Sequence, residues 1–278
     1  MKLKKALALI LAMLMIFSFA ACGSKPADNP ASDEPMSKVE QIKAAGKLVV
    51  GTSADYPPYE FHTDVNGEDK IVGVDISIAQ DIADELGVEL ELVDMAFDGL
   101  LISLQKGDFD MVLAALSPTE ERKKSVDFSD VFFINKQIVV IKKADADKIK
   151  TTADVAELKG GCQSGTIQFD ISSMYHKPEN IIQLVKFNEL LMELKTGKID
   201  CLYTNFLTGT AYVSGNDDLM VQDIGIEWAD LGFAAAIEKG NEDLVEVVNK
   251  VAAKYQTEGT IEKYIEDAVA LSGGADAL

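Results

Sequence analysis

The feature that most constrains the fold is a strand–helix–strand–helix–strand pattern that occurs twice along the chain. In each copy, short apolar runs of strand length alternate with stretches in which apolar residues recur at helical spacing. The first copy covers residues 47–51, 75–86, 88–93, 97–106 and 110–114. The second copy covers residues 161–163, 166–174, 181–186, 188–195 and 199–203. This alternation predicts an α/β protein with two open, mainly parallel sheets flanked by helices.

The helix expected over residues 75–86 carries the clearest local signals. Asp75 stands at its start, where an aspartate side chain commonly caps free backbone N–H groups. Gly87 follows the last apolar position and is a typical stop signal. The apolar face of this helix is expected to comprise Ile78, Ala79, Ile82, Ala83 and Leu86.

The second copy is expected to be an insertion into the first. A β-rich stretch over residues 127–143 separates the copies, and one more strand is predicted over residues 231–237. The helix predicted over residues 241–255 has an apolar face that must pack on a sheet, and the sheet of the first unit is the candidate. Two extended crossings, near residues 132–140 and 225–235, would then join two lobes that close by hinge motion.

Residues that suit ligand binding follow the predicted strands. Open α/β sheets bind ligands beyond the C-terminal ends of their strands, which here would be the cleft between the lobes. An aromatic tier, an arginine, a Gly-Thr helix N-terminus and an amide would suit one small ligand with a carboxylate and a side chain. These residues are Tyr56, Tyr59, Phe97, Ser117, Arg122, Gly165, Thr166 and Asn205.

Several of these residues also have a purely structural interpretation. We expect Tyr59 to be a core residue, whereas Tyr56 and Phe97 fit core packing and ligand stacking equally well. Thr166 could serve only as a helix N-cap, and Ser117 could only cap a turn. Their occurrence together at the ends of successive strands is what favours a ligand site.

Arg122 is the only arginine in a chain with 26 basic residues. It closes the stretch LSPTEER, just after a buried-looking strand. It could pair with Glu121 or Asp127 on a solvated face, but lysine would serve that purpose equally well. The planar guanidinium fork matches a carboxylate in a way that lysine cannot, so we expect Arg122 to bind an anionic group.

The N-terminal residues are typical of an exported lipoprotein. Basic residues precede a short apolar run, and small residues lead up to Cys22. The run FAAC resembles a lipobox, so residues 1–21 are expected to be a lipoprotein signal peptide and Cys22 the lipidated residue. The alternative is an ordinary signal that is cleaved elsewhere, with Cys22 uninvolved. Residues 22–36 have the composition of a flexible tether.

The charge and the remaining cysteines limit the partners. The net charge is −20, which disfavours nucleic acid and anionic lipid surfaces. Cys162 and Cys201 lie in predicted strands, and we expect buried free thiols although an exported protein could form a disulfide. His62 and His176 have no second ligand at a useful spacing, so no metal and no cofactor is expected.

Five segments resemble extracellular solute-binding proteins, family 3 type, of bacterial polar amino-acid ABC transporters. They are GTSADYPPYEF, GVDISIAQDIADELG, FDGLLISLQKGDFDMVLA, LSPTEERKKSVDFSD and KTGKID. The resemblance runs from about Lys47 to Tyr264 and implies a type II periplasmic-binding-protein-like fold with two lobes. It implies that Arg122 and Ser117 hold the ligand's α-carboxylate, helped by the Gly-Thr turn, and that Tyr56 and Phe97 enclose its side chain.

The sequence departs from the family pattern at positions that bear on the ligand. Asn205 stands where the family usually has an acid for the α-ammonium, and Ser77 replaces a second acid. Ser53 stands where binders of basic amino acids often have an acid, so a neutral amino acid or a related carboxylate is predicted. The ligand-binding residues implied by the resemblance are Tyr56, Phe97, Ala115, Ser117, Arg122, Thr166, Ile167, Gln168 and Asn205.

The predicted domains are residues 37–134 plus 230–278 for lobe 1 and residues 135–229 for lobe 2. The expected partners are an amino acid and an ABC transporter permease, with a lipid anchor as the membrane attachment of an otherwise monomeric, extracytoplasmic protein, in a bacterium of the Gram-positive type.

Two other functions fit the same pattern less well. A dehydratase of the prephenate or arogenate type resembles this family and would need an acid in the cleft, for which Glu60, Asp55 and Asp98 are candidates. A receptor's sensor domain would require a membrane-spanning helix, and none is predicted after residue 37. We therefore expect a binding protein that is not an enzyme.

Overall fold

The computed structural model describes residues 35–229 and 231–273, except for the side chains of residues 256–258. The described residues from Ser37 onward form one compact unit. The predicted signal peptide, Cys22 and most of the predicted tether lie outside the described residues. Among the helices that are described, none has both the length and the apolar character of a membrane span.

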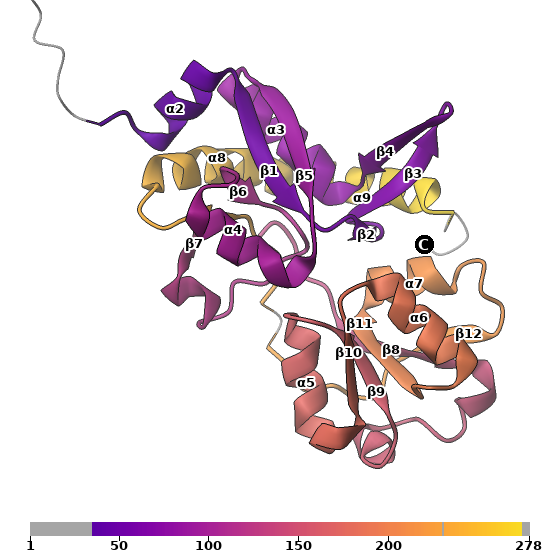
Figure 1. Cartoon of the computed structure of the whole chain (residues 1–278). Helices are drawn as coiled ribbons and strands as arrows, with labels where there is room; N and C mark the ends of the chain where they lie inside the picture. Colours follow the sequence, from indigo (N-terminus) through magenta and orange to yellow (C-terminus); the bar gives the residue numbers. More distant parts are fainter. Residues whose placement is uncertain (1–34, 230, 274–278) are drawn as a thin grey trace, which may run out of the picture. The chain divides into compact units, whose positions relative to one another are not determined.

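The first sheet has five strands in the order β5-β1-β6-β13-β7 (Figure 1). Its strands are β1 (Lys47–Thr52), β5 (Glu89–Asp94), β6 (Met111–Val112), β7 (Val126–Phe128) and β13 (Ala236–Glu238). β1 pairs in parallel with β5 and β6, whereas β13 is antiparallel to β6 and β7. The strand after the long excursion therefore returns to the first sheet, as the insertion predicts.

The second sheet has the order β10-β9-β11-β8-β12. Its strands are β8 (Gln137–Lys142), β9 (Gly160–Gln163), β10 (Ile181–Leu184), β11 (Cys201–Asn205) and β12 (Leu219–Gln222). β9 is parallel to β10 and β11, and β8 is antiparallel to β11 and β12. Both sheets are thus mixed rather than mainly parallel. The strands β7, β8, β12 and β13 carry the chain between the sheets without a helical crossover, so nothing forces them to run parallel.

Helices cover both sheets. They are α2 (Lys38–Ala45), α3 (Val74–Leu86), α4 (Leu100–Lys106), α5 (Ile167–Tyr175), α6 (Phe187–Thr196), α7 (Phe206–Val213), α8 (Glu242–Glu258) and α9 (Thr260–Leu271). Of these, α3, α4, α5, α6 and α8 lie close to the predicted ranges, whereas α2, α7 and α9 were not predicted. Short 3₁₀ turns are η2 (Phe97–Gly99), η3 (Arg122–Lys124), η4 (Lys143–Asp145), η5 (Thr152–Val155) and η6 (Pro178–Asn180).

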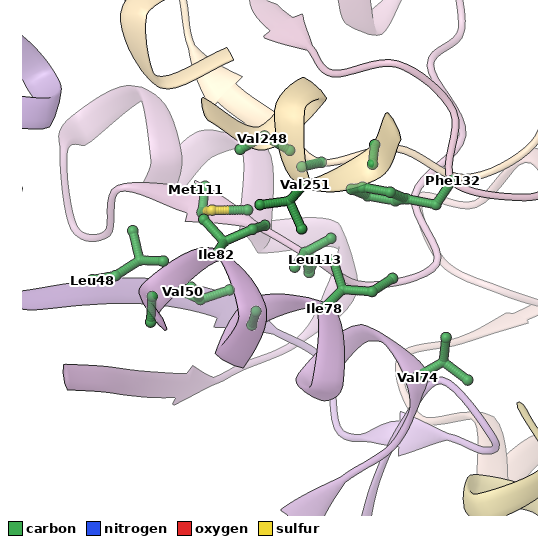
Figure 2. Packing of buried hydrophobic residues seen from close by; sticks show 14 of the residues in the cluster. Leu48, Val50, Val74, Ile78, Ile82, Met111, Leu113, Phe132, Val248 and Val251 are labelled. Atoms are coloured by element: carbon green, nitrogen blue, oxygen red, sulfur yellow. The ribbon is translucent and has the colours of Figure 1, made fainter. Parts of the chain in front are cut away.

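The core of the first lobe lies between its sheet and the helices α3 and α8 (Figure 2). The predicted apolar face of α3 is fully confirmed, because all five of its residues are buried. Gly87 ends the helix in the left-handed conformation, as expected. The predicted N-cap is wrong: Gly73 occupies the cap position, and Asp75 lies inside the helix with its side chain directed to another strand.

A small sheet of β2 (Asp55–Tyr56), β3 (Glu60–Val65) and β4 (Glu68–Val72) was not predicted. Its hairpin turns at Asn66 and Gly67, both with positive φ, and this Asn-Gly pair is a sequence signal that could have revealed it. Its strands are polar and half exposed, so they lack the apolar runs on which the strand predictions rest.

The two crossings between the sheets touch each other. An antiparallel bridge joins Phe133 to Phe233, and the Phe233 N–H donates to the Phe133 carbonyl at 3.0 Å. The Tyr59 ring stacks on Phe133 at 5.4 Å and is completely buried, which confirms its predicted place in the core. Cys162 and Cys201 are buried free thiols on neighbouring strands, also as predicted.

Candidate ligand-binding site

A cavity lies where the strands of both sheets end. The first lobe supplies the segments after β1 and β6, the start of β3 and the two turns η2 and η3. The second lobe supplies the end of β9 and the first turn of α5. The lining residues are Ser53, Tyr56, Glu60, Phe97, Ala114, Ala115, Ser117, Arg122, Gln163, Thr166, Ile167 and Gln168. Eight of the nine predicted ligand-binding residues are among them, and Asn205 is not.

The Arg122 guanidinium spans the two lobes. Its Nη1 donates to the Ser117 carbonyl at 2.8 Å, and its Nη2 donates to the Gly165 carbonyl at 3.0 Å. The Phe97 ring lies below it, 5.6 Å from the guanidinium carbon. Burial lowers the pKa of Arg122 to about 10, which still leaves it charged at neutral pH.

The alternative surface pairing of Arg122 is wrong, because its two candidate acids have other partners. Glu121 pairs with Lys124 at 2.5 Å, and Asp127 pairs with Lys239 at 3.2 Å. The guanidinium bonds use two of its five N–H donors, so donors remain for a carboxylate.

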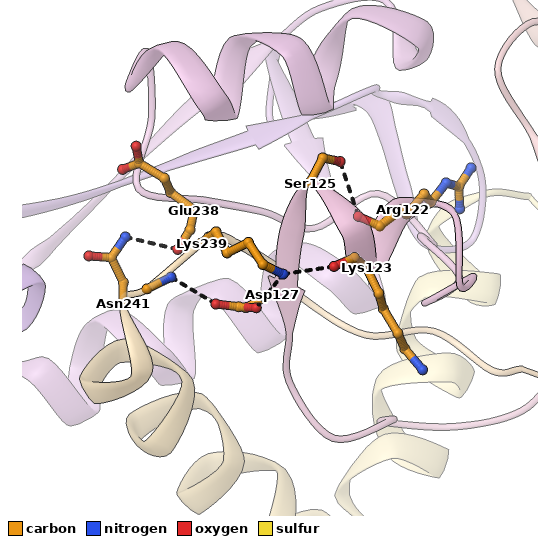
Figure 3. Close-up of polar contacts among 8 residues, drawn as sticks. Arg122, Lys123, Ser125, Asp127, Glu238, Lys239 and Asn241 are labelled. Atoms are coloured by element: carbon orange, nitrogen blue, oxygen red, sulfur yellow. Dashed lines mark hydrogen bonds and ion pairs between the residues drawn. The ribbon is translucent and has the colours of Figure 1, made fainter.

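The turn that carries Arg122 is fixed by backbone contacts (Figure 3). The Ser125 hydroxyl donates to the Arg122 carbonyl at 3.1 Å, and Lys239 donates to the Lys123 carbonyl at 2.8 Å. Asp127 on β7, the strand that follows this turn, accepts from the Gly240 N–H at 2.8 Å, just after the end of β13. The guanidinium points away from all these contacts, so η3 is a rigid base for the cavity-facing side chain.

The segment after β6 forms one wall of the cavity, and a residue of α3 holds it in place. Ala115 has a φ of 45°, an uncommon conformation for a residue other than glycine. Its N–H donates to Asp75 Oδ2 at 2.7 Å. Asp75 is 2 % exposed, and burial raises its pKa to about 7, although the bond from Ala115 opposes this shift.

The first turn of α5 faces the cavity from the second lobe. Thr166 occupies the N-cap position, but its hydroxyl donates to the Gln163 carbonyl at 2.7 Å and caps no N–H. Gly165 has a φ of 78°, and a Cβ there would lie 3.0 Å from the Asp98 Cα across the cleft. A glycine at this position therefore lets the two lobes approach closely. The free N–H groups of the turn are suited to an anion.

Asn205 lies behind the cavity wall rather than in it. Its Oδ1 accepts from the Thr208 N–H at 3.0 Å, which caps α7, and from Asn135 Nδ2 at 3.0 Å. Its Nδ2 donates to the Tyr56 hydroxyl at 3.0 Å, and Tyr56 is itself part of the lining. The structure thus places Asn205 where it holds the aromatic side chain that faces the cavity.

Tyr56 bridges the lobes as well. Its hydroxyl lies 2.8 Å from Thr204 Oγ1 on β11, and its ring meets Phe187 edge-on at 5.2 Å. Burial raises the pKa of Tyr56 to about 12, so the phenol stays neutral and can donate or accept. Both predicted aromatic residues, Tyr56 and Phe97, line the cavity.

Glu60 lines the cavity, although from the sequence it was a candidate only for the acid of a dehydratase. It is 1 % exposed, and its buried Oε2 has no hydrogen-bond partner. Burial raises the pKa of Glu60 well above its usual range, and the nearby carboxyls of Asp75, Asp55 and Asp94 raise it further. Ser53 stands where an acid was expected for a basic ligand, whereas Glu60 on β3 brings a carboxyl to the same cavity.

The site therefore combines a guanidinium and helix N–H groups with a buried carboxyl that has an unsatisfied oxygen. An anionic group suits the first pair, and a hydrogen-bond donor or cation suits the second. Two α/β lobes that enclose such a cavity define a two-lobe ligand-binding protein of the periplasmic type.

The comparison with known families agrees. The chain belongs to the bacterial extracellular solute-binding proteins, family 3, whose sequence pattern matches residues 48–268. It is 32% identical over 269 residues to the arginine-binding extracellular protein ArtP of Bacillus subtilis (strain 168), which covers 94% of this chain and 96% of ArtP.

Solved structures share the fold. A substrate-binding protein of an amino acid ABC transporter from Streptococcus pneumoniae Canada MDR_19A, bound to L-arginine, is 39% identical with a TM-score of 0.82. That match covers 85% of this chain and 99% of the other. The ancestral amino acid-binding protein AncCDT-1, a precursor of cyclohexadienyl dehydratase, is 33% identical with a TM-score of 0.74, over 84% of this chain and 100% of the other.

Proposed function

We propose that the protein binds an amino acid with a cationic side chain, L-arginine first of all, and delivers it to an ABC importer. The observation that carries this proposal is the buried, unpartnered Oε2 of Glu60 in the cavity that Arg122 also lines. A buried ionisable group without a partner is costly, and a ligand that brings a cation and several N–H donors would satisfy it.

The remaining lining residues suit the rest of such a ligand. The α-carboxylate would meet Arg122, Ser117 and the first turn of α5. Tyr56 and Phe97 would enclose the aliphatic and guanidinium parts, which an aromatic face attracts. The names of ArtP and of the pneumococcal protein, which refer to arginine, support the same ligand class.

This proposal replaces the neutral amino acid that the sequence favoured. That prediction rested on the absence of an acid at Ser53 and on Asn205 at the expected ammonium position. Glu60 supplies the acid from a neighbouring strand, and Asn205 lies outside the cavity lining. The loss of a charge at position 205 therefore says little about the ligand's side chain.

Calorimetric titration with L-arginine and L-citrulline tests the ligand class. The two ligands have the same length and shape, but the citrulline side chain is neutral. We expect L-arginine to bind at least tenfold more tightly, with proton release near neutral pH because the cation favours the ionised form of Glu60. Equal affinity for both ligands would contradict a cationic ligand class and would support a neutral one.

The cellular setting is part of the proposal. Residues 1–21 would be removed, lipidated Cys22 would anchor an extracytoplasmic monomer, and residues 22–36 would link it to the lobes. The lobes would comprise residues 37–134 plus 230–278 and residues 135–229, and would present the ligand to the permease. In a bacterium of the Gram-positive type, Cys22→Ser should release the protein from the membrane fraction into the medium; retention would argue against the anchor.

A dehydratase is the second candidate, favoured by the raised pKa of buried Glu60 and by the likeness to AncCDT-1. A buried carboxyl with a raised pKa could act as a general acid. We propose that the protein is not an enzyme, because a cationic ligand would hold Glu60 ionised. Incubation with prephenate or arogenate, followed by detection of the aromatic product, should show no turnover; a Glu60-dependent product would overturn this.

A further inference from the structure

We propose that Asp55 is a positioning residue that orients Gln163 in the cavity and ties the two lobes together. The inference rests on the proposed function, since it treats this cavity as the ligand site. Asp55 belongs to β2 in the first lobe, and three of its hydrogen-bond partners belong to the second lobe.

The contacts of Asp55 reach three separate elements. Its Oδ2 accepts from the Phe187 N–H at 3.0 Å, at the first residue of α6. Its Oδ1 accepts from Gln163 Nε2 at 3.3 Å, and its backbone carbonyl accepts from the Tyr212 hydroxyl at 2.8 Å. The carboxylate of one lobe thus caps a helix of the other, where the helix dipole favours a negative charge.

The amide of Gln163 has its orientation fixed by these contacts. Its Nε2 donates to Asp55 Oδ1 and to the Val185 carbonyl at 3.0 Å. A carbonyl oxygen accepts and never donates, so the NH₂ end must face Val185 and Asp55. The Oε1 end is then left for the cavity that Gln163 lines. Asp55 and the Val185 carbonyl together make position 163 a hydrogen-bond acceptor, which suits a ligand rich in N–H donors.

Hydrogen bonds rather than an ion pair hold the Asp55 carboxyl. Burial raises the pKa of Asp55, whereas the bonds from Phe187 and Gln163 lower it and Lys186 contributes less. All three tying contacts cross from one lobe to the other, so they exist only while the lobes stay together. Asp55 should therefore slow ligand release and also sharpen the choice of ligand.

Asp55→Asn is the first test, since its amide has the same shape. One end of the new amide is a donor that would face a donor, either the Phe187 N–H or Gln163 Nε2. In stopped-flow measurements we expect the release rate of L-arginine to rise about tenfold, and the preference for L-arginine over L-citrulline to fall. Glu189→Gln is the control, because it removes one negative charge from the first turn of α6 at an exposed side chain.

A double-mutant cycle with Gln163→Ala separates positioning from general stability. If Asp55 acts through Gln163, the two substitutions together should weaken L-arginine binding by less than the product of their separate effects. Tyr212→Phe keeps the stacking of its ring on Phe187 but loses the hydrogen bond to Asp55, so it should raise the release rate about threefold. This variant replaces Asp55→Asn as the test if Asp55→Asn fails to fold. Additive effects together with release rates within twofold of the parent would overturn the proposal.

A measurement without ligand distinguishes this inference from the proposed function. Spin labels at Lys106→Cys and Ser173→Cys, two exposed positions on different lobes, report the distance between the lobes in a Cys22→Ser background. The native Cys162 and Cys201 are buried and should remain unlabelled. Asp55→Asn should shift the population to longer distances even if L-arginine fails to bind. An unchanged distance distribution would refute the proposal that Asp55 ties the lobes together. Failure of the parent to bind L-arginine would refute only the proposed ligand.

Discussion

Asp75 accepts a hydrogen bond from the backbone N–H of Ala115 at 2.7 Å, so a buried carboxyl on α3 holds the cavity wall in a strained conformation. Ala115 has a φ of 45°, which costs an alanine on the order of 1–2 kcal/mol. The wall keeps this shape because the bond to Asp75 offsets part of that cost. The helix that builds the core of the first lobe therefore also shapes its ligand site.

The ionisation of Asp75 should make the protein less stable as the pH rises. Burial raises its pKa from 3.8 to about 7, so the folded state binds this proton more tightly than the unfolded state. Stability from this group is therefore lost between about pH 4 and pH 7 and stays constant above that. Asp75→Asn removes the titration but keeps an oxygen that accepts from Ala115. Calorimetric melting at pH 4.5, 6 and 8 should show that the melting temperature of the variant rises relative to that of the parent as the pH rises. A constant difference between the two melting temperatures would refute this.

Arg122 should be required for binding and dispensable for folding. Removal of one partner of a buried charged pair costs about 2–5 kcal/mol, which is roughly a thirtyfold to several-thousandfold loss of affinity for Arg122→Ala. Arg122→Lys keeps the charge but cannot reach the Ser117 and Gly165 carbonyls and the ligand together, so it should lose a large part of the affinity. Titration with L-arginine measures both variants, and circular dichroism confirms folding. Affinity of the lysine variant within twofold of the parent would show that the fork is unnecessary.

The periodicity of the sequence was sufficient to predict the two lobes, because helices and parallel strands have apolar patterns that can be read locally. The faces of α3 and α8 are examples, since their buried residues recur at helical spacing. Residues 127–143, which contain β8, were predicted to be β-rich, but the antiparallel pairing of β8 and the whole of β12 were not predicted. This pairing depends on the route of the chain between the lobes, which has no local signature. Strand ends likewise pointed to Arg122, Tyr56 and Phe97, since the end of a strand is visible in the sequence.

Two site residues needed the structure. Asn205 follows β11 as expected, yet Thr208, Tyr56 and Asn135 use its amide and keep it behind the lining. Glu60 begins a polar strand, and nothing in the sequence shows that its carboxyl is buried without a partner. The direction of a side chain near a strand end depends on neighbours that are distant in sequence.

Asn205 should contribute to stability more than to ligand choice. Asn205→Ala removes the cap of α7, which is worth about 0.5–2 kcal/mol. It also removes one hydrogen bond from Tyr56 and one from Asn135, which keep their contacts to Thr204 and Tyr59. We expect the free energy of unfolding to fall by about 2 kcal/mol or more in urea titrations. Asn205→Asp keeps the capping oxygen and should lose less. An alanine variant as stable as the parent would contradict the role assigned to this side chain.

Glu60 should decide between cationic and neutral ligands. Glu60→Gln keeps the size of the side chain but cannot become negative, so it should weaken L-arginine binding by roughly thirtyfold or more. L-citrulline needs no countercharge, and its affinity should change by less than threefold. The parent should bind L-arginine more tightly as the pH rises through the raised pKa of Glu60, because only the ionised carboxyl attracts the cation. The variant should lose this pH dependence.

Because the variant also removes a buried ionisable group, it should melt at a higher temperature than the parent at pH 8.

The matched control for Glu60 is Glu89→Gln, which makes the same change at an exposed position on β5. It should leave the affinity for both ligands and the pH dependence unaltered, because screening by solvent weakens a surface charge. Titrations of parent, variant and control between pH 6 and pH 9 give the full comparison. If Glu60→Gln lowers the affinity for L-arginine and L-citrulline by the same factor, Glu60 supports the shape of the cavity and carries no preference for charge. The unsatisfied Oε2 would then require another explanation, and the ligand class would have to be read from Arg122, Tyr56 and Phe97 alone.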